Sequence, residues 1–282
     1  MAKIAGVQHD IKIGDVDGNL MKMEQWYKEA RSNKAEIVVF PECAVTGYCF
    51  DSLEEARKYA EAIPGNTTNR MQGFCAEFGG YIAAGMLENA PCGGVYNALV
   101  LIGQEGIVGS YRKIHLPYLG VDRFSTFGDA EFDVNEVGDI KVGLNICYDS
   151  SFPESARVLS LLGAELIILS TNWPPSALCV AEYVVRTRAL ENRVYYIAVN
   201  RVGVENGNEF IGTSSICAPN GDVIALAGKD EETIIYADID PAVARQKLRV
   251  RSHEHMVDRI ADRRPEMYAS VVEEHTLKRP GR

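Results

Sequence analysis

Residues 142–154 read Val-Gly-Leu-Asn-Ile-Cys-Tyr-Asp-Ser-Ser-Phe-Pro-Glu, and they decide the fold prediction. An apolar run ends at Ile146, and Pro153 is typical of the first turn of a helix. A strand that turns directly into a helix is a building unit of α/β sheets and exposes side chains at the turn. Cys147 occupies that turn. Its position leaves two readings open: a nucleophile whose thiolate is favoured by nearby helical N–H groups, or an inert buried thiol.

Apolar runs alternate with helical patterns along the rest of the chain. The predicted strands are Ile4–Gln8, Ile37–Phe40, Tyr81–Met86, Tyr96–Ile102, Gly106–Arg112, Lys141–Ile146, Leu166–Leu169, Tyr195–Asn200, Thr213–Ala218, Val223–Leu226 and Thr233–Ala237. The predicted helices are Asn19–Ser32, Leu53–Ile63, Pro153–Leu162, Cys179–Asn192 and Pro241–Leu248. Strands that are apolar throughout indicate sheets buried on both faces, so the pattern predicts a layered α/β fold. The rough similarity of the two halves suggests two related sheets.

The chain is expected to form a single domain over residues 1–282. No linker or low-complexity tract divides it, and layered α/β domains often reach this length. The stretch after about residue 251 is charged and poorly periodic. We therefore expect a C-terminal arm over about 251–282 that lies on the surface or across a partner subunit.

Composition limits the classes of function. With 46% hydrophobic and 24% charged residues, the chain has the composition of a soluble globular protein, and no apolar run is long enough to cross a bilayer. The net charge of −10 disfavours binding to nucleic acid or to an anionic membrane. The N-terminus enters a strand-like segment without the apolar core and cleavage site of a signal peptide, which favours a cytoplasmic protein.

Metal and disulfide chemistry find little support in the sequence. The seven cysteines are odd in number and contain no Cys-x-x-Cys pair, so neither a disulfide framework nor a zinc ribbon fits. His253-Glu254-His255 lacks the spacing of the helical zinc-binding pair and lies in the charged C-terminal stretch. A metallohydrolase is therefore a weak alternative, and we expect no metal site.

Two further segments carry side chains suited to chemistry. Glu42 lies just past an apolar strand, where partial desolvation raises the pKa of a carboxyl group and suits it to proton transfer. Lys113 also follows a strand, and its ammonium could stabilise a developing oxyanion. The neighbouring Arg112 should point to the opposite face and play another part. Taken alone, Glu42 is more simply explained as a helix-capping or salt-bridged residue. Lys113, taken alone, is more simply explained as part of a solvated basic strand end.

Together the three segments resemble a known family. Phe40-Pro41-Glu42, Tyr111-Arg112-Lys113-Ile114-His115-Leu116 and Cys147-Tyr148-Asp149 with Phe152-Pro153-Glu154 look like the Glu, Lys and Cys motifs of the nitrilase superfamily of carbon–nitrogen hydrolases. They follow the order of the family, with separations of 71 and then 34 residues between the three candidates. Further matches are Arg186–Asn192, Gly212–Ser215 with Pro219–Gly221, and Arg263–Tyr268, so the resemblance spans essentially the whole chain.

The resemblance implies both an architecture and a mechanism. It implies a four-layer α-β-β-α sandwich and a homodimer that packs helices to extend this sandwich. It also implies that Glu42 takes the proton of Cys147, whose thiolate attacks an amide carbonyl while Lys113 and the Tyr148 backbone N–H hold the oxyanion. Water activated by Glu42 then hydrolyses the thioester. No metal or organic cofactor is needed.

The residues beside the cysteine indicate the substrate class. True nitrilases resemble Cys-Trp-Glu at this point, whereas Cys147-Tyr148-Asp149 looks like amidases and carbamoylases. The resemblance therefore implies hydrolysis of an amide or N-carbamoyl bond in a small molecule. Nitrile hydrolysis by the same cysteine is an alternative, and so is a non-catalytic interaction protein on this scaffold. The presence of all three chemical residues argues against the last.

One position departs from the family pattern. Many members carry a second Glu seven or eight residues after the lysine, but this chain has Gly120 and Val121 there. Asp122 is the nearest carboxylate. It either takes the role of the second acid through a shifted loop or pairs with Arg123 or another surface cation. His115 would suggest a Cys–His dyad, but the resemblance implies a structural part for it.

Several side chains are candidates for binding the substrate. They are Tyr48, Tyr148, Asn172 and Trp173. Trp173 is equally compatible with packing in the core. A substrate carboxylate would need a cationic partner, and Arg123 and Arg201 are the candidates between which the sequence does not decide.

Overall fold

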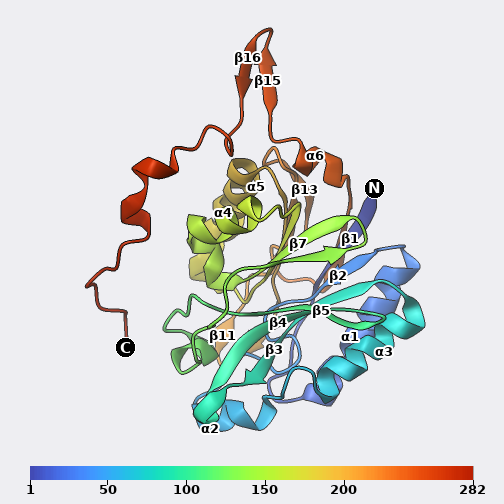
Figure 1. The fold of residues 1–282 in the computed structure, drawn as a ribbon. Helices are drawn as coiled ribbons and strands as arrows, with labels where there is room; N and C mark the ends of the chain where they lie inside the picture. Colours follow the sequence, from blue (N-terminus) through green and yellow to red (C-terminus); the bar gives the residue numbers. More distant parts are fainter. Residues whose placement is uncertain (282) are drawn as a thin grey trace.

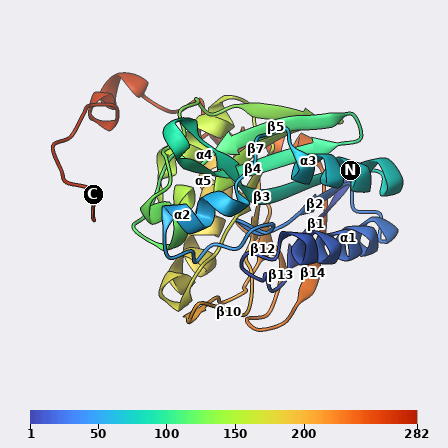
Figure 2. The same cartoon turned by 90° about the horizontal axis from the view of Figure 1, so that it is seen from below.

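Two six-stranded mixed sheets lie at the centre of the molecule (Figures 1 and 2). The computed structural model describes residues 1–281, apart from the side chain of Cys92. In spatial order the first sheet consists of β14 (Thr233–Ile239), β1 (Ala2–Gln8), β2 (Ile37–Val39), β3 (Tyr81–Asn89), β4 (Val95–Gly103) and β5 (Gly106–Arg112). The second consists of β13 (Val223–Leu226), β12 (Ser215–Cys217), β9 (Tyr195–Val199), β8 (Leu166–Ser170), β7 (Ile140–Ile146) and β6 (Val134–Val137).

The two sheets share one order of strand pairings. In the first, β1 pairs antiparallel with β14, the pairs β1–β2 and β2–β3 are parallel, and β3–β4 and β4–β5 are antiparallel. Starting from β6, the second sheet repeats this series through β7, β8, β9, β12 and β13. The two halves of the chain are thus related in topology, as their similar sequence patterns suggested.

Helices cover the outer face of each sheet. Leu20, Met23 and Tyr27 of α1 (Val16–Ser32) pack on the first sheet together with α3 (Asn66–Phe78). On the second sheet, α4 (Pro153–Leu161) and α5 (Val185–Asn192) do the same. α1 and α3 therefore lie on the opposite side of the molecule from α4 and α5 (Figure 1). This arrangement confirms the predicted α-β-β-α sandwich.

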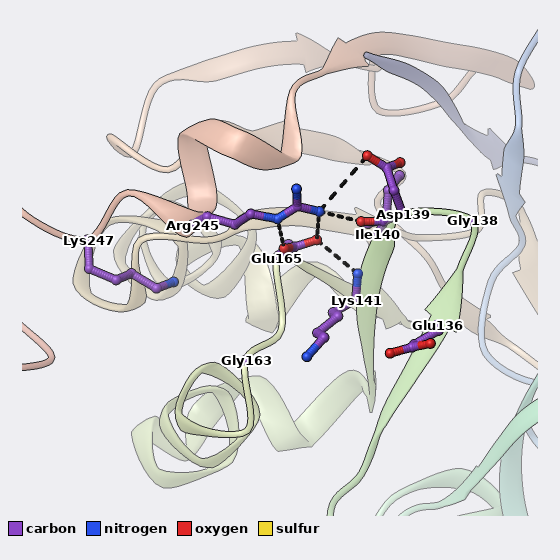
Figure 3. Close-up of a pocket in the computed structure, with 9 residues that line it drawn as sticks. All are labelled: Glu136, Gly138, Asp139, Ile140, Lys141, Gly163, Glu165, Arg245 and Lys247. Carbon is purple, nitrogen blue, oxygen red and sulfur yellow. Dashed lines mark hydrogen bonds and ion pairs between the residues drawn. The ribbon is translucent and has the colours of Figure 1, made fainter.

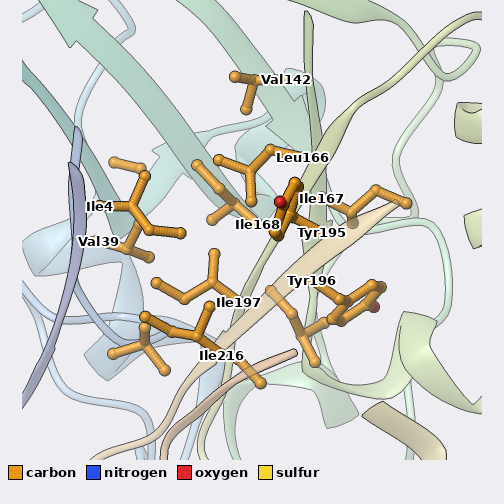
Figure 4. Close-up of a cluster of buried hydrophobic side chains, with 14 of the residues drawn as sticks. Ile4, Val39, Val142, Leu166, Ile167, Ile168, Tyr195, Tyr196, Ile197 and Ile216 are labelled. Atoms are coloured by element: carbon orange, nitrogen blue, oxygen red, sulfur yellow. The ribbon is translucent and has the colours of Figure 1, made fainter. Parts of the chain in front are cut away.

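The core between the sheets follows from the period of the strands. Because successive side chains of a strand point to opposite faces, Ile4 and Val39 face the second sheet, whereas Val38 faces the helices. Ile168 and Ile197 approach Ile4 and Val39 from the opposite sheet (Figure 4). Each of these side chains is fully buried and contributes about 1.5–3 kcal/mol to folding. Strands that are apolar on both faces are the cause of the four-layer packing.

Some predicted elements differ from the observed ones. The helix expected over Leu53–Ile63 is wrong beyond its first turns, since α2 (Leu53–Ala56) passes into one 3-10 turn that ends at Tyr59. α3 and β6 were not predicted. Thr67, Thr68 and Gly73 are weak helix formers, but burial of Phe74 and its neighbours holds α3 in place.

The C-terminal part lies outside the sandwich. After α6 (Pro241–Arg245), strands β15 (Arg249–Ser252) and β16 (His255–Val257) form an exposed hairpin that projects from the body, and residues 258–281 run along the outside (Figure 1). A second small ribbon joins β10 (Val204–Glu205) and β11 (Asn208–Glu209). Among the described helices, none has the length and apolar character that spanning a membrane requires.

Candidate active site

The three chemical residues predicted from the sequence meet where the two sheets face each other. Glu42 follows β2, Lys113 directly follows β5, and Cys147 directly follows β7. Side chains beyond the carboxyl ends of strands form the usual ligand sites of α/β folds. The strand ends are also tied across the sheets, because Asn172, after β8, donates its Nδ2 to the backbone oxygen of Glu42 at 2.9 Å.

Lys113 lies between two fully buried carboxylates. Its Nζ donates to Oε1 of Glu42 at 2.7 Å and to Oδ2 of Asp122 at 2.6 Å. Asn97 Nδ2 donates to the same two carboxylates at 2.7 and 2.9 Å. Tyr48 donates its hydroxyl to Oδ2 of Asp122 at 2.9 Å. Asp122 therefore pairs with the site lysine, and the alternative ion pair with Arg123 does not form.

The local backbone explains how Asp122 reaches the site. It lies in a 3-10 turn, Gly120–Arg123, and the Val121 N–H donates to the Tyr48 carbonyl at 2.9 Å. Gly120 has φ of +47°, and a Cβ there would lie 2.1 Å from the Tyr48 ring, so glycine is needed for this close approach. The turn thus brings the Asp122 carboxylate within hydrogen-bond distance of Lys113.

Asn97 was missed in the sequence. It lies in β4, where Tyr96 and Ala98 are also buried, and its side chain bridges both carboxylates. A buried amide within an otherwise apolar strand requires hydrogen-bond partners, so its position was a usable signal. Nothing in its local sequence identified which partners these would be.

In this buried cluster the pKa values of both Glu42 and Lys113 are raised. Burial raises the pKa of Glu42 and the charge of Asp122 adds to this, outweighing the opposing effect of Lys113. Burial alone would lower the pKa of Lys113, but Asp122 and Glu42 together raise it well above the usual value. Oε2 of Glu42 is buried and has no hydrogen-bond partner among the described residues. Glu42 thus offers one oxygen for proton exchange.

Cys147 is presented by a strained turn. Its φ is +44°, a conformation that side chains other than glycine rarely adopt, and it begins a 3-10 turn that ends at Ser151. Asp149 fixes this turn: its Oδ2 accepts from the Ile146 N–H at 2.9 Å and from the Tyr111 hydroxyl at 2.8 Å. Strain of this kind is typical of functional turns, and it directs the thiol out of the sheet.

His115 does not form a dyad with the cysteine. Its Nδ1 lies 2.7 Å from Oδ1 of Asp149, and its ring stacks on Phe152 with centroids 3.7 Å apart. His115 therefore supports the turn that carries Cys147 from behind. The structural part expected for it fits this geometry.

The Cys147 thiol is protonated in this environment. Burial raises its pKa to about 12, and the charge of Glu42 adds to the effect, whereas Lys113 lowers it. The Thr171 hydroxyl lies 3.6 Å from the sulfur, and a hydrogen bond from the Asn172 backbone N–H also favours the thiolate. A thiol in this state needs a base before it can attack a carbonyl, and Glu42 is the base within electrostatic reach.

Comparisons with known proteins agree with this geometry. A family model described as Carbon-nitrogen hydrolase matches residues 3–248. The chain belongs to the carbon–nitrogen hydrolase family. The protein is thus an enzyme that acts on non-peptide C–N bonds, as the three motifs indicated.

Relatives of this carbon–nitrogen hydrolase cover most of its length. It is 41% identical to a protein named nitrilase from Pyrococcus abyssi, over 95% of this chain and 99% of the relative. It is 35% identical to the omega-amidase NIT2 of Xenopus tropicalis, over 79% and 83% of the two chains. An amidase structure from Nesterenkonia sp. AN1 superposes with a TM-score of 0.80 at 22% identity, over 96% and 97% of the chains, which shows the shared fold.

A cavity of about 330 Å³ opens next to these residues in the carbon–nitrogen hydrolase. Tyr48 and Asn172, two of the predicted substrate-binding residues, line it together with Arg123. Trp173 lies in the hydrophobic core instead, because its ring packs among the apolar side chains behind the strand. Tyr148 does not line this cavity either: it is partly exposed and contacts Phe152 edge-on.

A second cavity, of about 490 Å³, lies away from the predicted site residues (Figure 3). Two of its charged side chains, Arg245 and Glu165, form an ion pair, and Glu165 also accepts from the Lys141 backbone N–H at 2.9 Å. These contacts fasten α6 to the amino-terminal ends of β7 and β8. Arg245 and Glu165, which line this cavity, thus have a structural role.

Proposed function

We propose that this protein hydrolyses the C–N bond of an amide or N-carbamoyl group in a small molecule through a thioester at Cys147. The observation that carries the proposal is the pairing of a neutral, buried thiol with Glu42, whose free Oε2 lies in the same buried cluster. Relatives with activities in their names support the amide class, among them the omega-amidase and a 2-oxoglutaramate amidase from Bacillus subtilis that is 32% identical.

Acylation begins with proton transfer. Glu42 accepts the thiol proton of Cys147 as sulfur attacks the carbonyl carbon, and the carbonyl oxygen becomes an oxyanion stabilised by Lys113 and the backbone N–H of Tyr148. When the tetrahedral intermediate collapses, the C–N bond breaks and Glu42 gives its proton to the leaving nitrogen. Ammonia or an amine departs, and the acyl group remains on sulfur as a thioester.

Deacylation uses the same groups. Glu42 accepts a proton from water, hydroxide adds to the thioester carbonyl, and the C–S bond breaks. The carboxylic acid leaves and Cys147 regains its proton from Glu42. Asp122 holds Lys113 as a cation throughout, which is the role we propose for it as the second acid of the site. The scheme uses neither a metal nor an organic cofactor.

Nitrile hydrolysis is the second candidate. The 41% identical relative from Pyrococcus abyssi carries the name nitrilase, and a thiolate can attack a nitrile carbon as well. The Cys147-Tyr148-Asp149 sequence favours the amide. We rank the amide first for that reason.

We also propose a cytoplasmic homodimer. Val158 and Leu161 of α4, with Leu162 directly after it, are exposed large apolar side chains on the outer layer, where a second copy would cover them. The single-domain unit 1–282 would then extend its arm, from about residue 251, across the partner subunit. We propose no nucleic-acid or membrane partner, in line with the acidic net charge.

Ammonia release from a panel of small amides, N-carbamoyl compounds and nitriles tests the activity. We expect amides or N-carbamoyl compounds to give the largest kcat/KM, and the Cys147→Ala variant to give background rates. Preference for nitriles would replace the first candidate with the second. Normal folding with no turnover of any class would favour a non-catalytic scaffold.

A further inference from the structure

The cavity lined by Tyr48 and Asn172 contains one cation that forms no ion pair with a carboxylate of the described residues. Arg123 and Asp51 are the charged residues that line it. Asp51 is exposed, so water screens its charge. Arg123 is only partly exposed and has no carboxylate within ion-pair distance among residues 1–281. Its positive charge therefore dominates the inner wall of the cavity.

Two backbone carbonyls hold the guanidinium of Arg123 in place. Nε donates to the Gly120 oxygen at 3.0 Å, and Nη2 donates to the Phe50 oxygen at 2.9 Å. Both acceptors are neutral, so the charge stays uncompensated. Nη1 and the second hydrogen of Nη2 remain for another acceptor, and together they form the forked edge that matches a carboxylate. The side chain is thus oriented before any ligand arrives.

Other arginines near the site are already paired. Arg201, the second candidate from the sequence, is fully buried between Glu205, at 2.5 Å, and Asp10, at 2.8 Å. Its guanidinium also lies 4.5 Å from the centre of the Phe210 ring. Arg112 pairs with Glu88 at 2.6 Å. The geometry therefore decides between the two candidates that the sequence left open.

The cavity that Arg123 lines is also lined by two residues that contact the candidate catalytic groups. Asn172 lines it and bonds to Cys147 through its backbone N–H, and Tyr48 lines it and bonds to Asp122. Arg123 follows Asp122 directly in one 3-10 turn, so one short segment carries the inner acid and the outer cation. A volume of about 330 Å³ is near the lower limit for small-molecule sites and suits a ligand of few carbons.

We infer that Arg123 binds a carboxylate at the far end of the substrate, whose amide end lies at Cys147. The substrate class is then the monoamide of a short dicarboxylic acid. This inference rests on the proposed amide hydrolysis and adds to it the group that selects the substrate. The guanidinium and the carboxylate would form a bidentate pair, whose charge-assisted hydrogen bonds are stronger than those between neutral groups.

A second arginine near the cavity provides a matched control. Arg279 of the C-terminal segment lies 4.7 Å from the centre of the Phe127 ring, and Gly281 lies against Tyr118, which also lines the cavity. Arg279 is exposed, and its charge is screened. It would add general electrostatic attraction, whereas Arg123 would add a directed pair.

The test compares two substrates of equal chain length, succinamate with a carboxylate and butyramide without one. The measured quantity is the ratio of their kcat/KM values. We expect a ratio well above one for the unmodified protein, reduced about 10- to 100-fold in Arg123→Gln, as for loss of a hydrogen bond to a charged group. The change should lie mainly in the KM for succinamate, because ground state and transition state use the contact alike. Arg123→Lys should restore part of the ratio, and Arg279→Gln should change it by less than about threefold.

Binding separates this inference from the proposed activity. Calorimetric titration of succinamate into Cys147→Ala, with and without Arg123→Gln, measures the contact without turnover. Binding that depends on Arg123 supports the carboxylate site even if no amide is hydrolysed, in which case only the proposed function fails. An unchanged ratio in Arg123→Gln, including an equal loss for both substrates through a displaced loop, overturns the inference. So does an equal effect of Arg279→Gln, since that indicates general attraction.

Discussion

The two sheets share one pairing order but end in different chemistry. By that order β1 of the first sheet corresponds to β7 of the second. β7 leads into the turn that presents Cys147, whereas β1 ends at Gln8 and is followed by His9, and both of these residues are fully buried. Gln8 bonds to the Gly228 and Ser214 backbones, and burial lowers the pKa of His9 to about 3, so its imidazole is neutral. Equivalent strand ends thus hold the proposed nucleophile in one half and pack loops in the other.

Charge is divided between the sheets as well. Glu42 and Lys113 follow strands of the first sheet, whereas Thr171 and Asn172, which surround the thiol, are neutral and follow a strand of the second. Burial of an unpaired charge is costly, and the first sheet meets this cost with a complete network around Lys113. The fold therefore brings a charged cluster from the first sheet against a neutral thiol from the second. The proposed attack by Cys147 requires proton transfer between the two sheets.

Cys43 sharpens this contrast. It follows Glu42 and has φ of +49°, close to the +44° of Cys147, so the two sheets end in cysteines of similar backbone conformation. Cys43 is fully buried with its sulfur 3.7 Å from the Asn97 oxygen, and burial raises its pKa well above the usual value. Conformation alone does not make a nucleophile, because access to the cavity and to a base is also needed.

The largest difference in activity is expected between two variants in which Cys147 or Cys43 is replaced singly by alanine. Cys147→Ala should lower kcat/KM on amides by about 10⁴-fold or more, since it removes the group that forms the covalent intermediate. Cys43→Ala should leave kcat within about tenfold and cost about 1 kcal/mol of stability. Steady-state kinetics with thermal unfolding of both variants measures this. Equal losses in activity would contradict the assignment of the nucleophile to the second sheet.

The second effect concerns proton transfer between the sheets. Glu42→Gln keeps the shape and the Lys113 contact but cannot accept a proton, so kcat should fall about 10²- to 10⁴-fold. Acyl-enzyme formed from a reactive ester should then persist on Cys147, and intact-protein mass spectrometry would detect it. Glu36→Gln, at an exposed site, is the control and should behave like the unmodified protein. Rapid turnover in Glu42→Gln would mean that another group serves as base.

The smallest of these effects concerns Asp122. Glu42 must be ionised to accept the thiol proton, and burial followed by the charge of Asp122 raises its pKa. Asp122→Asn removes that charge and lowers the pKa of Glu42, so the acid limb of the kcat/KM–pH profile should move to lower pH. The lost contact to Lys113 should reduce kcat about 10- to 100-fold. Asp129→Asn, which removes an exposed partner of Arg112, should leave the profile in place. A shift to higher pH in Asp122→Asn would refute this coupling.

The sequence was informative where local pattern and tertiary position coincide. Short apolar runs such as Leu166–Leu169 predict buried strands, and most of the predicted strands lie within a few residues of the observed elements. The sequence patterns did not predict α3, because packing there overrides the weak helix propensity of its residues. They also predicted too long a helix after Leu53, because the helix that contains Glu54 and Glu55 ends at Ala56. Asn97 was missed for a related reason, because its two partners are distant in sequence.

By itself the sequence determined the layered α/β fold and the family, and it predicted the three chemical residues, because strand period and short motifs are local properties of the chain. Only the tertiary structure decided between alternatives that depend on distance. It placed Asp122 on Lys113 rather than on Arg123. Within the part of the chain that the structure describes, it left Arg123 without a carboxylate partner while burying Arg201 in ion pairs. Hydrogen bonds and ion pairs require atoms within about 3–4 Å, and only the packed chain brings residues from separate strands that close.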